Sequence, residues 1–162
     1  MKKGMKKNWN TLKTLLLCVL IVYAFALLGS LFTSSAVKSP WYDSIRVSLT
    51  PPNWIFPVVW NILFFLIALS LFYAWTSAKK KSRKNVAIVF GINLFLNALW
   101  SLLFFSLKKT NLAFFELIVL WISILFMIFT TRKINKRSAW LLVPYAIWVG
   151  FAGILNYLIA FR

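Results

Sequence analysis

Long uncharged stretches alternate with short clusters of lysine and arginine along this chain. No Asp, Glu, Lys or Arg occurs within residues 14–37, 47–78, 85–107, 117–131 or 138–161. A helix crosses the hydrocarbon core of a bilayer with about 20 apolar residues, and several of these stretches exceed that length. The pattern predicts an all-α integral membrane protein and excludes a soluble enzyme.

The simplest interpretation is a single domain, residues 1–162, built as a bundle of five transmembrane helices. Short connections join the second to fifth spans, which favours antiparallel neighbours. The exception is a ligand-covering loop over about 34–54, and loops of that length are more often functional than mere connectors. We expect the spans at about 12–33, 55–76, 86–107, 111–131 and 138–160.

Basic residues are distributed unequally between the two sides of such a bundle. Fourteen lie in the N-terminal tail and in the second and fourth loops, whereas five lie in the other loops and at the C-terminus. The positive-inside rule therefore places the N-terminus in the cytoplasm and the C-terminus outside. We expect a multi-pass protein of the cell (cytoplasmic) membrane, with the lipid bilayer as its surroundings.

The composition of the 162 residues narrows the possible chemistry. There is no histidine, one cysteine, and only Asp43 and Glu116 are acidic. These counts predict no metal site and no resident cofactor. The net charge of +17 would suit nucleic acid, but the basic residues fall between apolar runs rather than along one stripe. We therefore expect no nucleic-acid partner.

Amides and aromatic residues recur at helical spacing within the spans. An amide that faces hydrocarbon loses its hydrogen bonds, so we expect these side chains to point into the bundle, where they either join helices or line a cavity. Tryptophans far from the ends of the spans also allow two interpretations, packing in the core or stacking on a ligand. One face of the third span carries Asn93, Asn97, Trp100 and Phe104 beside Ser101, and one face of the fifth carries Tyr145, Trp148, Ala152 and Asn156.

Three further residues of the spans carry separate expectations. Ala87 and Gly91 form a small-xxx-small pair on the third span, which predicts a homodimer through that helix. Glu116 is expected near the outer interface, early in the fourth span. Pro144 should kink the fifth span near residue 140, because proline removes a helical hydrogen bond.

Five segments follow one another in order: Trp41-Tyr42-Asp43, Thr50 to Trp60, Asn97 to Phe105, Glu116 with Leu120-Trp121, and Ala139 to Asn156. In residues and spacing these segments resemble the tryptophan-rich sensory protein / translocator protein family (TspO/MBR). In the second half of the first loop, this chain has Arg46-Val47-Ser48-Leu49 where the family usually has Lys-Pro-x-Trp.

The resemblance implies five helices, usually a homodimer, and a pocket beneath the first loop that binds porphyrins such as protoporphyrin IX. Related proteins bind cholesterol and benzodiazepine-type drugs. Carried over by position, Trp60 and Trp148 are also the residues linked to light- and oxygen-dependent porphyrin breakdown. The ligand-binding residues expected here are Tyr42, Arg46, Trp60, Asn97, Trp100, Ser101, Tyr145, Trp148 and Ala152.

The leading hypothesis is a membrane protein that binds tetrapyrroles for sensing, sequestration or transport, with Arg46 available to a propionate. The first alternative is a porphyrin-degrading enzyme that uses Trp60 and Trp148 as catalytic residues. The second is a small transporter or accessory subunit with no porphyrin role. The scarcity of charged residues within the spans argues against coupled ion transport.

The topology makes a testable prediction in a variant whose Cys18 is replaced by Ala. A thiol introduced by Ser82→Cys should react with a membrane-impermeant maleimide only after the cells are permeabilised. The matched Ser48→Cys, in the first loop, should react in intact cells. The reverse labelling pattern would overturn the orientation given by the basic residues.

Overall fold

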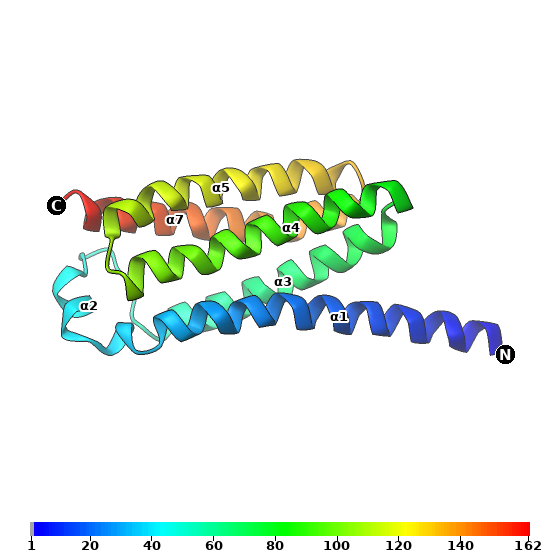
Figure 1. Ribbon diagram of the computed structural model, residues 1–162, viewed down its shortest axis with the longest axis horizontal. Coiled ribbons are helices and arrows are strands. Elements are labelled where there is room, and N and C mark those ends of the chain that lie inside the picture. The colour runs from blue at the N-terminus through cyan, green and yellow to red at the C-terminus, as the bar shows by residue number, and fades with distance from the viewer. Residues whose placement is uncertain (1) are drawn as a thin grey trace.

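The computed structural model describes residues 2–162, with side chains from Trp9 onward. All regular elements of the described chain are helical (Figure 1). The π-helical turn η2 continues α4 directly. The elements are α1 (Lys2–Thr33), η1 (Ala36–Lys38), α2 (Pro40–Ile45), α3 (Ile55–Ser77), α4 (Lys80–Ser101), η2 (Leu102–Ser106), α5 (Thr110–Arg132), α6 (Lys136–Leu141) and α7 (Val143–Ala160).

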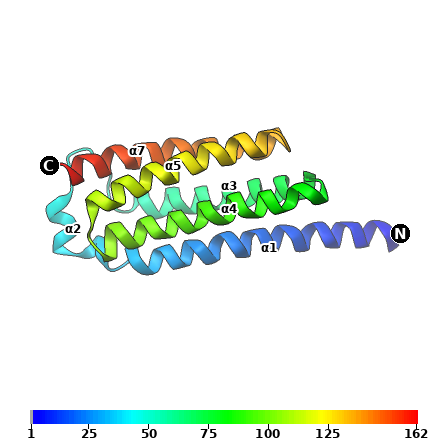
Figure 2. The ribbon, with the colours of Figure 1, turned by 45° about the horizontal axis from the view of Figure 1, so that its top comes forward.

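The long helices lie side by side along the long axis of the molecule (Figures 1 and 2). Helix α1 packs against α3 and α4, and α5 packs against α4 and α7. The short helix α2 covers one end of the bundle, where the C-terminus also lies, and the N-terminus lies at the opposite end. The expected five-helix bundle is therefore confirmed.

Within the described residues, five helical segments are long and apolar enough to cross a membrane. The third begins at Lys80, six residues before the expected start near 86, because the basic cluster itself is helical. Lysine and arginine have high helix propensity, so their charge marks the end of the apolar span without ending the helix. The segments are Trp9–Lys38, Ile55–Ser77, Lys80–Ser106, Thr110–Arg132 and Lys136–Ala160.

The fifth span is broken where a kink was expected. Helix α6 ends at Leu141, and α7 begins at Val143 with Pro144 in its first turn. Proline is tolerated there because the missing N–H has no helical partner in a first turn. The predicted interruption is thus confirmed as a change between two helices at Leu142.

The π-helical turn at the end of α4 was not expected from the sequence. The amide of Leu107 donates to the carbonyl of Leu102 at 2.9 Å, and Lys108 then adopts a φ of 54°. Such wide turns are rare and are frequent at functional sites. The turn has three consecutive buried residues, Leu103, Phe104 and Phe105, and these pack against Tyr42 of α2.

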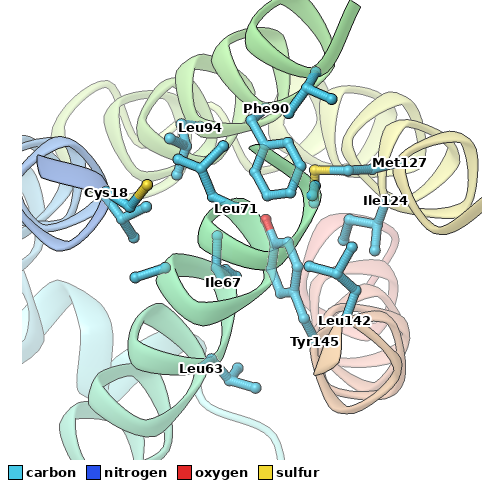
Figure 3. Packing of buried hydrophobic residues seen from close by; sticks show 14 of the residues in the cluster. Cys18, Leu63, Ile67, Leu71, Phe90, Leu94, Ile124, Met127, Leu142 and Tyr145 are labelled. Carbon is cyan, nitrogen blue, oxygen red and sulfur yellow. The ribbon is translucent and has the colours of Figure 1, made fainter. Parts of the chain in front are cut away.

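The bundle core consists of aliphatic and aromatic side chains from all the long helices. Figure 3 shows the ring of Tyr145, which is fully buried, among Ile67 of α3, Ile124 of α5 and Leu142. In a water-soluble protein the hydrophobic effect would make burial of such side chains stabilising. Between helices in a bilayer, close packing and hydrogen bonds take the place of the hydrophobic effect.

A pair of serines joins α3 to α6 inside the bundle. The hydroxyl of Ser70 donates to the carbonyl of Ser138 at 2.9 Å, and the hydroxyl of Ser138 donates to the carbonyl of Ser70 at 2.8 Å. Both residues are 0% exposed. Each hydroxyl therefore forms a hydrogen bond with the other helix at a buried position that water does not reach.

We predict that Ser70→Ala and Ser138→Ala each lower the stability of the folded protein. A double-mutant cycle on thermal unfolding in detergent should give a coupling free energy of about 1 kcal/mol, because the two hydroxyls act as a pair. The control is Thr76→Ala, since the exposed Thr76 bonds only to its own helix. Strictly additive effects of the two serine substitutions would contradict the pairing.

Candidate ligand-binding cavity beneath the first loop

A cavity of about 430 Å³ lies between α1, α3, α4 and α7, at the end of the bundle covered by the first loop. The loop contributes Val37, Tyr42, Thr50 and Asn53 to its lining, and η2 contributes Phe104 and Phe105. The size falls within the range of small-molecule sites in proteins, which is roughly 300–1,000 Å³. The loop that the sequence marked as functional therefore covers a real hollow.

The first loop is held in place over the cavity by contacts along its length. Ser39 caps α2, because its side-chain hydroxyl accepts a hydrogen bond from the backbone amide of Tyr42 at 3.3 Å. The ring of Trp41 packs edge-on against Phe104 and lies 5.3 Å from the ammonium of Lys108. These contacts connect the loop to η2, so the cover and the π-helical turn form one unit.

Aromatic rings form opposite walls of the cavity. Trp60 of α3 stacks on Phe64 with ring centroids 5.3 Å apart. Trp100 of α4 stacks on Phe104 at 5.1 Å and 23°. Flat, rigid surfaces of this kind suit a planar conjugated molecule, because ring faces attract at offset-stacked geometry.

Trp148 supplies a further wall from α7. Its ring meets Phe56 of α3 edge-on at 5.9 Å and Phe151 at 5.7 Å. Trp60 and Trp148 therefore approach the cavity from different helices and are both part of its lining.

Hydrogen bonds between α4 and α7 involve residues that line the cavity. Trp100 Nε1 donates to Asn156 Oδ1 at 3.1 Å, and Asn156 Nδ2 donates to the carbonyl of Thr110 at 2.9 Å. Asn97 Nδ2 donates to the Tyr145 hydroxyl at 3.1 Å. The two helical faces that the sequence singled out thus meet each other inside the bundle.

Several polar groups of the lining have no hydrogen-bond partner within the described chain. They include the indole N–H of Trp60, the indole N–H of Trp148 and the hydroxyl of Tyr42. Burial raises the pKa of the Tyr42 hydroxyl, although the nearby Arg46 lowers it in part. The hydroxyl therefore keeps its proton at neutral pH and remains a donor.

The described lining contains no charged residue and no histidine, cysteine or methionine. It consists of aromatic and aliphatic side chains with neutral hydroxyls and amides. An imidazole, thiolate or thioether ligand to a metal centre is thus unavailable among these residues. The arrangement suits a largely apolar ligand that is recognised by shape, stacking and a few hydrogen bonds.

The structure brings together most of the residues that the sequence proposed for the site. Arg46 and Tyr145 do not line the cavity. Arg46 donates to the carbonyl of Pro51 at 3.2 Å and lies 4.0 Å from Asp43, so it supports the loop. Tyr145 lies behind Asn97, 0% exposed. The lining includes Tyr42, Trp60, Asn97, Trp100, Ser101, Trp148 and Ala152.

The contribution of α1 was missed at the level of sequence. The Tyr23 hydroxyl donates to the backbone carbonyl of Asn61 at 3.2 Å, and both residues line the cavity. Asn61 is exposed, but it lines the cavity as expected for an amide within a span, and its Nδ2 donates to the carbonyl of Pro57 at 2.8 Å. The sequence does contain a pattern that indicates this face of α1. Tyr23, Ala26, Leu27 and Ser30 recur at helical spacing along it.

The remaining singled-out amides and Glu116 lie in the interior. Asn93 is 0% exposed and donates through Nδ2 to the Ser123 hydroxyl at 2.8 Å, so it joins α4 to α5 as an amide between helices. Glu116 is 9% exposed, and its carboxylate has no hydrogen-bond partner among the described residues. It therefore faces the interior of the bundle, early in α5, and it is not part of the cavity lining.

Comparisons with known proteins agree with this architecture. The model of the TspO/MBR family matches residues 18–162. A protein of Chlorobaculum tepidum named "Tryptophan-rich protein TspO" is 35% identical over 147 residues, which cover 90% of this chain and 93% of the relative.

Two other relatives show how widely the similarity extends. One of the same name from Archaeoglobus fulgidus is 37% identical, with 93% of this chain and 96% of the relative covered. The sheep "Translocator protein" is 28% identical, with 80% and 73% covered. This tryptophan-rich bundle of five membrane-spanning helices belongs to the TspO/MBR family.

Proposed function

We propose that this protein binds porphyrins such as protoporphyrin IX in the cavity beneath the first loop, and acts in their sensing, sequestration or transport in the cell membrane. The observation that carries the proposal is an uncharged cavity of about 430 Å³ walled by Trp60, Trp100 and Trp148. Relatives whose names describe a sensory protein and a translocator support a role in ligand recognition.

The walls and the free polar groups have different tasks in this proposal. The macrocycle stacks on the indole faces, while the N–H groups of Trp60 and Trp148 and the Tyr42 hydroxyl donate to its acceptor atoms. The propionates stay at the outer rim, since the lining offers no cation. Arg46 is a basic residue of the loop, and its guanidinium donates to the carbonyl of Pro51, which follows the lining residue Thr50.

A second candidate function is photo-oxidative porphyrin degradation. It is favoured by the presence of Trp60 and Trp148 in one cavity, each with an indole N–H that bonds to nothing else in the described chain. Light would excite the bound porphyrin, molecular oxygen would be the oxidant, and the indoles would exchange an electron with the excited ring. Binding in the dark is a requirement of both functions.

We predict that protoporphyrin IX quenches the tryptophan fluorescence of the purified protein saturably in the dark, and that Ala152→Phe weakens this binding about tenfold or more. A phenyl ring at Ala152 fills part of the cavity, and displaced contacts of this size cost more than about 1.4 kcal/mol, a factor of ten. The matched control is Ala24→Phe on the exposed, non-lining side of α1, which should bind normally.

The same preparation separates the candidate functions. Dark binding without loss of the porphyrin bands under light supports a binding protein. Bleaching that disappears in Trp60→Phe and in Trp148→Phe supports the enzyme. An absence of saturable quenching in the wild type points to a transporter or accessory subunit without a porphyrin role.

We also propose that the protein forms a homodimer through α4. Ala87 and Gly91 are exposed on the outer face of that helix, and a Cβ added at Gly91 would meet no atom within 4 Å of its own chain. Small residues of this kind let two helix backbones approach closely in lipid. The proposal leaves the cavity on the opposite side of the helix free.

For this interface, Gly91→Leu should shift the protein from dimer to monomer in detergent, because the isobutyl group separates the helices. Cross-linking and size-exclusion chromatography with light scattering measure the change. Ala24→Leu, which alters an exposed position on α1, is the control. A dimer unchanged by Gly91→Leu would refute contact at this position.

A further inference from the structure

The end of the bundle opposite the cavity is strongly basic. We call it the basic end and define it by the α3–α4 turn, the last residue of α5, the α5–α6 turn and the first residues of α4 and α6. Every cation of these segments is exposed. They are Lys79, Lys80, Lys81, Arg83, Lys84, Arg132, Lys133, Lys136 and Arg137.

No carboxylate balances this charge. The chain has only two acidic side chains. Asp43 lies in α2, at the other end of the bundle, and Glu116 is buried in α5. Among the described residues, the ion pair that forms is Arg46 with Asp43, far from the basic end. The cations therefore repel one another unless an anion from outside the chain lies among them.

The two turns form one surface at the level of the helix ends. Asn135 Nδ2 donates to the Ser77 hydroxyl at 2.8 Å, which connects the α5–α6 turn to the end of α3. Only residues 78–79 separate α3 from α4, and only residues 133–135 separate α5 from α6. Turns this short cannot project far beyond the spans, so the cations lie at headgroup depth.

Aromatic rings mark the same depth. The guanidinium of Arg83 lies 5.6 Å from the ring of Trp75, and the ammonium of Lys133 lies 4.0 Å from the ring of Phe129. Trp140 is 74% exposed one turn into α6. Indole rings are enriched at the membrane interface, where they sit beside the lipid headgroups.

We propose that the basic end binds the phosphate groups of anionic phospholipids in the leaflet that it faces, and that these headgroups bridge the α3–α4 and α5–α6 turns. Charge complementarity, headgroup depth and the neighbouring indoles favour lipid over a soluble polyanion. Clusters of this size directly beside a membrane span attract anionic lipid. The bridging lipid stabilises the bundle at the end where the two helix pairs are joined by the Ser77–Asn135 bond. The proposal is independent of what the cavity binds.

The test is the unfolding temperature of the full-length protein in a neutral detergent, titrated with phosphatidylglycerol. We expect a saturable rise that shrinks as sodium chloride is added, because salt screens exposed charges. Phosphatidylcholine, with no net charge, should give no such rise. Glycerol phosphate, which has the anionic headgroup chemistry without acyl chains, should have little effect.

Matched variants locate the effect. Lys80→Gln, Lys84→Gln and Lys133→Gln together should weaken the apparent affinity for phosphatidylglycerol about fivefold for each lysine removed. Lys38→Gln, Lys108→Gln and Lys109→Gln, at the opposite end, should leave the affinity unchanged. If the first variant does not fold, the salt and lipid series on the wild type still test the proposal. The three Lys→Arg substitutions, which keep the charge, should then retain the affinity for phosphatidylglycerol.

Three results would overturn the proposal. An equal rise with phosphatidylcholine would mean that acyl chains alone stabilise the bundle. An equal rise with glycerol phosphate would assign the cluster to a free anion. Equal losses of affinity in the two triple variants would place the lipid elsewhere on the protein.

Discussion

Hydrogen bonds that polar side chains make inside the hydrocarbon region determine how these helices are arranged. At that depth a polar group finds no water, so each amide and indole must be satisfied by another helix or else remain costly. The bonds from Trp100 to Asn156 and from Asn97 to Tyr145 both run from α4 to α7. Asn156 extends the connection to the backbone of α5 through Thr110.

The cavity follows from these connections. Because Trp100 and Asn97 use their N–H groups to hold α7, they stand as fixed walls, and the indole N–H of Trp100 is occupied. Trp60 and Trp148 make no such bond, so their N–H groups have no hydrogen-bond partner among the described residues. Among the tryptophans that line the cavity, Trp100 therefore also joins two helices by a hydrogen bond, whereas Trp60 and Trp148 do not.

The two ends of the bundle differ in the contacts that their side chains make. At the covered end, the loop, α2 and η2 pack together through aromatic contacts such as Trp41 with Phe104, and the single ion pair of the described residues lies there. At the basic end, short turns and helix ends carry exposed cations that have no acidic partner among the described residues. One end contains an uncharged cavity, and the other presents exposed cations.

Much of this protein was determined by local pattern. Runs of apolar residues specify membrane spans, Pro144 specifies the break in the last span, and the spacing of Asn97 with Trp100 and of Trp148 with Ala152 specifies which helix faces point inward. These features depend on the chain's own periodicity and on the absence of water in lipid, so the sequence alone predicts them.

Only the tertiary structure decided which inward residues line the cavity and which lie behind its wall. Tyr145 shares a helical face with Trp148, yet Asn97 stands between it and the hollow. Arg46 turns to the carbonyl of Pro51, and the π-helical turn brings three consecutive residues into the interior. Tyr23 joins the site because α1 packs beside α3. Helical periodicity fixes the direction in which a side chain points from the axis of its own helix. Which residue it then contacts depends on the rotation and depth of the neighbouring helices, and contacts between residues distant in sequence set these.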